Sequence, residues 1–219
     1  MFLLIEMSEP RVRVVDYSKL KRALESAVLM DPKLATVIEL VGYPSPRIRP
    51  AEFVTLLQVI VSQQVSTRAA SAINDRLLKL CGGKVTWRKI LNRSGDQLRE
   101  CGLSQNKVDY VRGLAEKIRT KELDLELLKS MDTDSVIAHL VKVRGLGRWS
   151  AEIFAMFALG HRDVFPVDDL ALQVAVQRYH GLRQKPSPKE TARLAEKWSP
   201  ERSAVALLMW KYYGATTLN

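Results

Sequence analysis

The chain of 219 residues carries 34 lysines and arginines against 24 aspartates and glutamates, which gives a formal net charge of +10. Hydrophobic residues make up 47% of the sequence, a share typical of a folded protein and too high for a disordered basic tail. Met1 to Ile5 lacks the flanks of a signal peptide, and no later apolar run reaches the ~18 residues of a membrane span. We therefore expect an intracellular, soluble protein, cytoplasmic or nuclear, whose excess positive charge serves an anionic partner.

The cysteines and histidines exclude several common metal and redox sites. Only Cys81 and Cys101 are present, without a Cys-x-x-Cys motif, which excludes a zinc ribbon, a four-cysteine iron–sulfur cluster and a disulfide scaffold. His139, His161 and His180 are too far apart in the sequence for a helical pair of metal ligands. We interpret each histidine as an ordinary surface or boundary residue.

Apolar residues recur at helical spacing along almost the whole chain. Only Val12 to Val15 alternates like a strand, and that segment is too short to imply a sheet. The pattern predicts an all-α protein of about ten short helices. The clearest stripes are Phe53, Leu56, Leu57, Ile60 and Val61; Val108, Val111, Ala115 and Ile118; Val136, Ile137, Leu140 and Val141; and Trp149, Ile153, Phe154 and Phe157.

Three segments combine a capping side chain with a proline at the next position, which is a signal for the start of a helix. They are Asp31-Pro32, Ser187-Pro188 and Ser199-Pro200, and Glu190 adds the glutamate of a capping box to the second. We predict a helix after each of them.

Two seams divide the predicted helices into lobes. Pro44-Ser45-Pro46 ends an N-terminal helical pair, and the loop from Arg162 to Val167 joins two later helices. We predict one lobe made of residues 1–48 with 166–219 and a central lobe of residues 49–165. A loop at such a seam could place a polar group in a cleft between the lobes.

The stretch from Leu140 to Glu152 reads as a helix, a tight turn with Gly145 and Gly147, and a second helix. Glycines permit left-handed backbone angles and a close approach of a ligand. The amides that open the second helix point outward at the positive end of its dipole and suit an anion. Lys142, Arg144 and Arg148 suit the same anion, although a plain helical corner would also use two glycines.

Asp168 and Asp169 directly precede another apolar helical pattern, which begins at Leu170. One of the two carboxylates is expected to cap that helix. A carboxylate at a helix N-terminus is favoured as an anion and could stabilise positive charge that develops in a reaction. A pair of aspartates that only cap is the alternative.

Four ordered motifs run from Ile60 to Ala70, from Arg144 to Ala151, from Asp163 to Asp169 and from Trp198 to Trp210. They resemble those of the helix-hairpin-helix DNA glycosylases, most closely their 3-methyladenine DNA glycosylase II branch. The resemblance covers roughly residues 50–214 and implies a two-lobed all-α fold, although the chain has no room for the N-terminal β-domain of larger members.

The resemblance implies excision of alkylated purines, chiefly 3-methyladenine and 7-methylguanine, from duplex DNA. Asp169 would be the catalytic carboxylate at the floor of the cleft, with Asp168 as a cap or supporting group. Trp149, Trp210 and Phe165 would line the base pocket, with core packing as the alternative for each tryptophan. Members that also cut the strand carry lysine where this chain has Trp149, so we expect hydrolysis of the glycosidic bond alone.

The resemblance also implies how DNA is held. Gln64 would fill the gap left by a flipped base, whereas a polar helix connection is the alternative for this segment. No cofactor is required, but the main-chain carbonyls of Val141, Val143 and Leu146 could hold a Na⁺, K⁺ or Mg²⁺ ion beside a phosphate. We expect a monomer with no membrane partner. The remaining expected DNA contacts are Gln63, Arg144, Gly145, Gly147, Arg148 and Ser150.

Two other functions fit the same motifs. A helix-hairpin-helix protein that binds DNA structures without catalysis would use the hairpin and keep both aspartates as caps. A related glycosylase for oxidised or deaminated bases would share the motifs and differ in the shape of its pocket. Release of a free methylpurine separates the first alternative from catalysis, and a panel of lesions separates the second.

Overall fold

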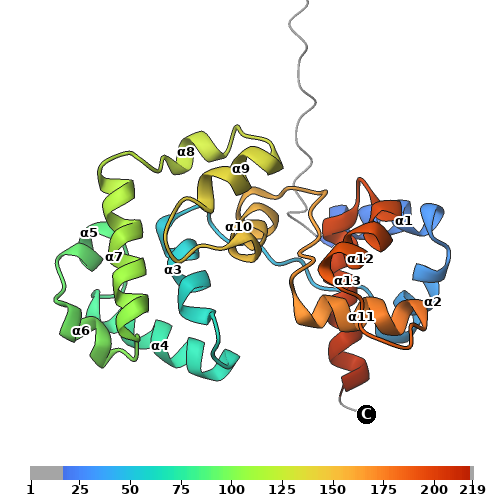
Figure 1. Cartoon of the computed structure of the whole chain (residues 1–219), viewed down its shortest axis with the longest axis horizontal. Helices are drawn as coiled ribbons and strands as arrows, with labels where there is room; N and C mark the ends of the chain where they lie inside the picture. Colours follow the sequence, from blue (N-terminus) through green and yellow to red (C-terminus); the bar gives the residue numbers. More distant parts are fainter. Residues whose placement is uncertain (1–16, 218–219) are drawn as a thin grey trace, which may run out of the picture. The chain divides into compact units, whose positions relative to one another are not determined.

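The computed structural model describes residues 17–217 and is helical, as the sequence pattern predicts, with no strand in that part of the chain (Figure 1). Ten of its α-helices have seven or more residues. None of the helices within these residues is long and apolar enough to cross a membrane. The strand-like alternation at Val12–Val15 lies outside the described residues.

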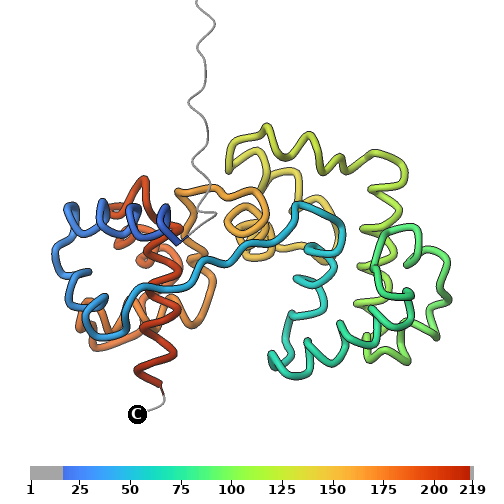
Figure 2. The backbone as a smooth tube through the Cα atoms, turned by 180° about the vertical axis from the view of Figure 1, so that it is seen from behind, coloured from blue at the N-terminus to red at the C-terminus, as the bar shows by residue number. Residues whose placement is uncertain are grey.

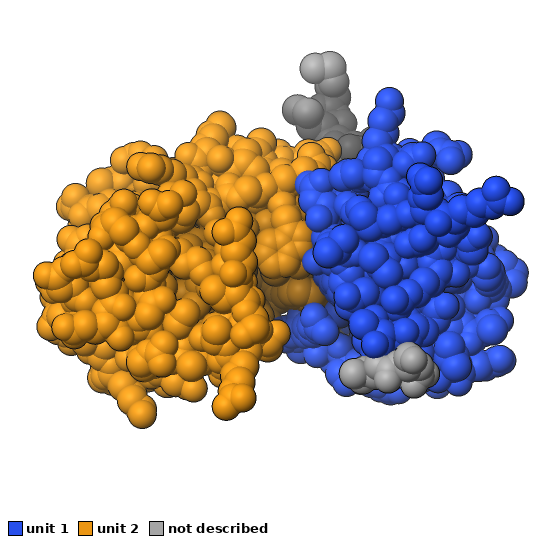
Figure 3. Space-filling model, turned by 60° about the horizontal axis from the view of Figure 1, so that its bottom comes forward, with its two compact units in different colours: residues 1–48, 160–219 blue, residues 49–159 orange. Residues whose placement is uncertain are grey.

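The chain folds into two compact units, one of residues 1–48 with 160–219 and the other of residues 49–159 (Figure 3). The chain passes from one unit to the other twice, at 48/49 and at 159/160, and Figure 2 follows both passages. The first boundary coincides with the sequence-based division. The second lies six residues before the expected 165/166, because residues 161–164 are bonded to the start of the last helix.

The first unit is built around its last helix, α13 (Arg202–Thr217). Residues 203–209 of this helix are all buried, as expected of a helix that is apolar on every side and has neighbours around it. It packs against the three other long helices of the unit. The helices of this unit are α1 (Tyr17–Met30), α2 (Lys33–Val41), α11 (Leu170–His180), α12 (Pro188–Ala195) and α13, with a 3-10 turn at Glu196–Trp198.

The second unit is centred on two packed groups of helices. The long helix α7 (Gln105–Arg119) packs on α3 (Phe53–Ser62) and α5 (Trp87–Leu91), and α10 (Arg148–Phe154) packs on α3 and α9 (Thr133–Leu140). Helix α10 continues into a π-helical turn at Ala155–Leu159. The remaining helices are α4 (Thr67–Leu80), α6 (Gly95–Glu100) and α8 (Leu125–Leu128).

The three predicted helix starts have different outcomes. Ser187 caps α12 and forms the full capping box with Glu190, which confirms that prediction. A helix also follows each of the other two segments, but the predicted capping roles of Asp31 and Ser199 are wrong. Pro32 holds the N-cap position of α2, while Asp31 is buried and accepts hydrogen bonds from aromatic side chains. Helix α13 begins only at Arg202, and the Ser199 hydroxyl donates to Asp163 at 2.7 Å.

Candidate functional site

In the first unit, the half-buried Asp169 is the N-cap residue of α11. Its Oδ1 accepts a hydrogen bond from the Leu172 amide at 3.0 Å and another from the Trp210 indole Nε1 at 3.1 Å. One of the two carboxylates therefore caps α11, as expected, but it is Asp169, so a capping role for the exposed Asp168 is wrong. The carboxylate that the family resemblance singles out is therefore fixed by a helix amide and an indole N–H.

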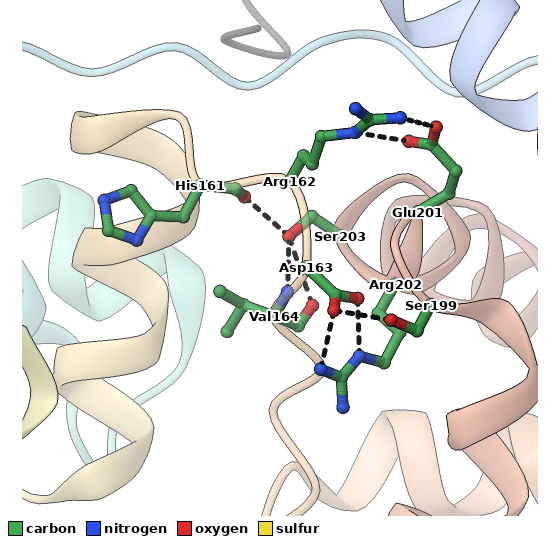
Figure 4. A network of polar contacts seen from close by, with 8 residues as sticks. All are labelled: His161, Arg162, Asp163, Val164, Ser199, Glu201, Arg202 and Ser203. Carbon is green, nitrogen blue, oxygen red and sulfur yellow. Dashed lines mark hydrogen bonds and ion pairs between the residues drawn. The ribbon is translucent and has the colours of Figure 1, made fainter. Parts of the chain in front are cut away.

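A network of polar contacts fixes the loop that leads to Asp169 (Figure 4). Ser203, at the start of α13, accepts from the Val164 amide at 3.0 Å, and its hydroxyl lies 2.7 Å from the His161 carbonyl, to which it donates. The Arg202 guanidinium binds both oxygens of Asp163, with Nε 2.6 Å from Oδ1 and Nη2 2.8 Å from Oδ2. Because α13 also carries Trp210, these bonds anchor the loop before Asp169 to the helix that supplies its indole partner.

Arg47 is a neighbour of Trp210 that the sequence analysis does not identify. Its guanidinium lies 5.6 Å from the centre of the half-buried indole, within reach of a cation–π attraction. Arg47 also lines a pocket of about 260 Å³ in the first unit. Arg47 and Trp210 are far apart in the sequence, and no sequence pattern indicates that they are in contact.

Phe165 is expected in the base pocket, but the structure places it in the core of the first unit. Its exposure is 5%, and its ring centre is 5.6 Å from that of the fully buried Trp198. The ring therefore packs inside the unit and offers little surface on which a base could stack.

In the second unit, the turn between α9 and α10 forms the predicted hairpin. Gly145 has a φ of +92°, and a Cβ atom there would lie only 2.4 Å from the ring of Tyr110. Gly147 does not use the left-handed backbone angles that glycine permits, because its φ of −86° is accessible to any residue. A Cβ at Gly147 would meet nothing within 4 Å. Gly145 thus serves internal packing, whereas Gly147 leaves an open approach to the start of α10.

The basic residues around this hairpin are all exposed. The Arg144 guanidinium lies 5.7 Å from the centre of the Tyr110 ring. Arg148 is 59% exposed and pairs at 2.9 Å with Glu152, whose side chain is 3% exposed. No side chain caps α10 at Gly147. The first turn of α10 is therefore uncapped by side chains and flanked by cations.

Two residues expected to contact DNA, Gln63 and Ser150, make hydrogen bonds inside the unit. Gln63 donates from Nε2 to the Gly145 carbonyl at 2.9 Å and to the Ser150 hydroxyl at 3.1 Å. Ser150 is only 2% exposed. These bonds join the end of α3 to the hairpin, so the two side chains support the hairpin from within.

Gln64 and Trp149 remain at the surface of the second unit. Gln64 is exposed and has a φ of +55°, an uncommon conformation for a residue other than glycine. Such conformations cluster at functional sites, where the surrounding structure enforces them. Trp149 is half-buried in the first turn of α10.

The three carbonyls that could hold a cation lie in the hairpin turn. The Val143 carbonyl already accepts the Leu146 amide at 3.0 Å. The carbonyls of Val141 and Leu146 accept no main-chain hydrogen bond among the turn and loop contacts of the described residues. Carbonyl oxygens suit Na⁺, K⁺ or Mg²⁺, so the donor set fits such an ion.

A comparison with protein families matches residues 57–201 to the HhH-GPD superfamily of base excision DNA repair proteins. The chain belongs to this superfamily. The matched region includes Gln64, the hairpin and Asp169, and it ends before Trp210. Its helix-hairpin-helix element is the α9–α10 turn.

Curated proteins and solved structures named as DNA glycosylases or glycosidase-like proteins resemble the chain over most of its length. The alkylbase DNA glycosidase-like protein mag2 of Schizosaccharomyces pombe is 27% identical and matches 90% of this chain and 93% of its own. The DNA-3-methyladenine glycosylase 1 of the same yeast is 30% identical over 83% of this chain and 82% of its own. The structure of a 3-methyladenine DNA glycosylase from S. pombe in complex with abasic DNA matches with a TM-score of 0.80 and 27% identity, and covers 87% of this chain and 95% of that one.

Proposed function

We propose that the protein is a DNA glycosylase that removes alkylated purines from duplex DNA in base excision repair. The observation that carries this proposal is the Asp169 carboxylate, which is fixed at the start of α11 by Leu172 and Trp210. The names of the relatives supply the substrate class, because they are described as alkylbase or 3-methyladenine glycosylases.

The chemistry needs a fixed negative charge next to the deoxyribose. When the bond between the sugar and a cationic alkylated base breaks, the base leaves with the bonding electrons as a neutral molecule. Positive charge then develops on the sugar, and a nearby carboxylate stabilises it. Water adds to the sugar carbon and loses its proton. Asp169 would supply the anion, and the bond from Trp210 would keep its Oδ1 in a set orientation.

The second unit would supply the grip on DNA. The open start of α10 at Gly147 and the exposed Arg144 and Arg148 suit a backbone phosphate. A Na⁺, K⁺ or Mg²⁺ ion held by the carbonyls of Val141, Val143 and Leu146 would add positive charge beside that phosphate. Gln64 would enter the stack when the damaged base is flipped out.

We also propose that the enzyme does not cut the DNA strand. A glycosylase that cuts the strand forms a Schiff base through an amine, and the resemblance places that lysine at the position of Trp149. Trp149 has no amine. The half-buried indole could instead stack on an electron-poor base.

A panel of lesions tests the proposed activity. Duplexes that each carry one 7-methylguanine, hypoxanthine or 8-oxoguanine are incubated with the protein, and the free base and the strand length are measured. We expect release of 7-methylguanine before the other two, with strands that stay intact until treated with alkali. Release of hypoxanthine or 8-oxoguanine alone would assign another substrate class. Strands that break without alkali and can be trapped with borohydride would contradict hydrolysis alone.

A further inference from the structure

The turn that carries Gln64 lies between α3 and α4 and is held in an unfavourable backbone conformation. Gln64 is one of two non-glycine residues with a positive φ among those described. Its side chain is exposed and forms no hydrogen bond within the described part of the chain, so it does nothing to hold its own backbone in place. Other contacts must therefore stabilise the turn.

Lys107 makes two of those contacts from the neighbouring helix. Its ammonium donates to the carbonyl of Val61 at 2.7 Å and to the carbonyl of Gln63 at 2.7 Å. These carbonyls belong to the last turn of α3 and its C-cap, where helix carbonyls lack partners within the helix. A cation at this end is also favoured by the helix dipole. Lys107 thus binds the chain directly before Gln64.

The environment of Lys107 differs from that of an ordinary surface lysine. Its side chain is half-buried, and burial lowers the pKa of its ammonium. On the other side of the turn, the Gln63 amide reaches the Gly145 carbonyl of the hairpin at 2.9 Å. The residue before Gln64 is therefore bonded to α7 through its carbonyl and to the hairpin through its side chain.

We propose that Lys107 is a positioning residue that holds the α3–α4 turn so that Gln64 can enter the DNA stack. This inference rests on the proposed function, because it gives a role in base flipping to a lysine that bonds within the protein. Lys107 would act through the backbone of Gln64 and would not contribute a phosphate contact of its own.

The test measures insertion into DNA separately from chemistry. A duplex carries an abasic site with 2-aminopurine opposite it, and the fluorescence of 2-aminopurine rises when a side chain enters the stack. The variants are Lys107→Met, Lys107→Arg, Gln64→Ala and Lys107→Met combined with Gln64→Ala. Lys117→Met is the matched control, because Lys117 lies on the same helix and pairs with Glu122 at 2.8 Å. Urea unfolding of each variant and its affinity for undamaged duplex are measured in parallel.

We expect Lys107→Met to lose most of the fluorescence rise and to slow single-turnover base release by roughly 10-fold or more, because small misplacements can cost about 100-fold. Its affinity for undamaged duplex should match that of Lys117→Met, since each variant loses one charge. Lys107→Arg should restore most of the rise. In the Gln64→Ala background, Lys107→Met should cause no further loss.

Losses that multiply in the double variant, or a Lys107→Met protein that behaves like Lys117→Met, would overturn the inference. If Lys107→Met does not fold, Lys107→Gln keeps an uncharged N–H donor group on a shorter side chain and should give an intermediate rise. A rise equal to that of the wild type would again overturn the inference. A wild type that raises the fluorescence but releases no base would refute the proposed activity alone.

Discussion

Asp169 combines two roles in one side chain. As the N-cap of α11 it accepts the Leu172 amide, and in the proposed reaction its charge, oriented by the bond from Trp210, stabilises the positive sugar. The two roles are compatible, because the contacts that cap the helix also fix the direction of the carboxylate. They can be separated by a substitution that keeps the cap and removes the charge.

Valine substitutions at the two hairpin glycines are predicted to affect different properties, fold stability at Gly145 and DNA binding at Gly147. Gly145→Val should destabilise the fold by more than about 2 kcal/mol, because its φ of +92° and the Tyr110 ring exclude a side chain. Gly147→Val should leave the free energy of unfolding within about 0.5 kcal/mol of the wild type, since the site is open and its φ is ordinary. It should nevertheless weaken binding to both undamaged and lesion-bearing duplex.

Urea unfolding and fluorescence anisotropy with labelled duplex check this pair. Unchanged DNA binding by Gly147→Val would remove the hairpin from the DNA interface. A Gly145→Val protein as stable as the wild type would contradict the packing against Tyr110.

At the scale of single residues, the sequence motifs identify the types of residue in the site but not their orientation. Asp168 and Asp169 are adjacent in the sequence, and only the structure shows that the second turns back to cap α11. Gln63 and Gln64 are likewise equivalent in the pattern, yet one bonds to the hairpin and the other is exposed. Lys107 has no sequence signal, because its partners are main-chain carbonyls.

At the scale of elements, α11 and the 3-10 turn before Ser199 meet the α1–α2 junction in a buried polar cluster. The Asp31 carboxylate accepts from the Tyr179 hydroxyl at 2.6 Å and the Trp198 indole at 2.8 Å, and it pairs with Lys197 at 2.6 Å. Burial alone would raise the pKa of Asp31, but the bonds from Lys197, Tyr179 and Trp198 lower it. Because the Asp31 carboxylate is engaged by these three side chains, it does not cap α2.

The lowered pKa of His180, at the end of α11, predicts that the stability of the first unit depends on pH. Burial, together with the nearby Lys197 and Lys33, lowers the pKa of His180 from its ordinary value of 6.5, while Asp31 acts in the opposite direction. The folded state therefore resists protonation of His180 more than the unfolded state does. Its contribution to stability is complete above pH 6.5 and is lost as the pH falls through the lowered pKa.

We expect the urea midpoint of the wild type to fall as the pH decreases below 6.5 and that of His180→Phe to fall less steeply. His139→Phe is the control, because His139 is exposed and bonds to the Ser135 carbonyl of its own helix at 2.8 Å. Equal slopes for wild type and His180→Phe between pH 7.5 and 5 would contradict the role given to His180. The measurement is a urea titration at each pH.

At the scale of the whole molecule, helical periodicity is enough to predict the all-α class, because each long helix buries one stripe and α13 buries every side of its first turns, residues 203–209. The division into units follows from the proline-rich seam at the first boundary. The second boundary depends on long-range bonds from Ser203 and Arg202 to residues 161–164, which local sequence cannot show. Cap signals at Asp31 and Ser199 fail for the same reason, since buried partners elsewhere claim these side chains.

The net charge of +10 acquires a more specific meaning from the structure. Several cations are engaged within the protein, such as Lys107 at the end of α3 and Arg202 on Asp163. Others are exposed around the hairpin, where Arg144 and Arg148 flank the open start of α10. In the proposed reaction the chemistry itself depends on an acidic residue, Asp169, in the other unit.

The most direct test compares Asp169→Asn with Asp168→Asn on methylated duplex DNA, with release of free methylpurine measured under single-turnover conditions. Asparagine caps a helix as well as aspartate does, so α11 should remain intact while the charge is lost. We expect the wild type and Asp168→Asn to release the base at similar rates and Asp169→Asn to be slower by about 100-fold or more. A wild type that releases no methylpurine, or an Asp169→Asn protein that releases it at the wild-type rate, would contradict the assignment of Asp169 as the catalytic residue.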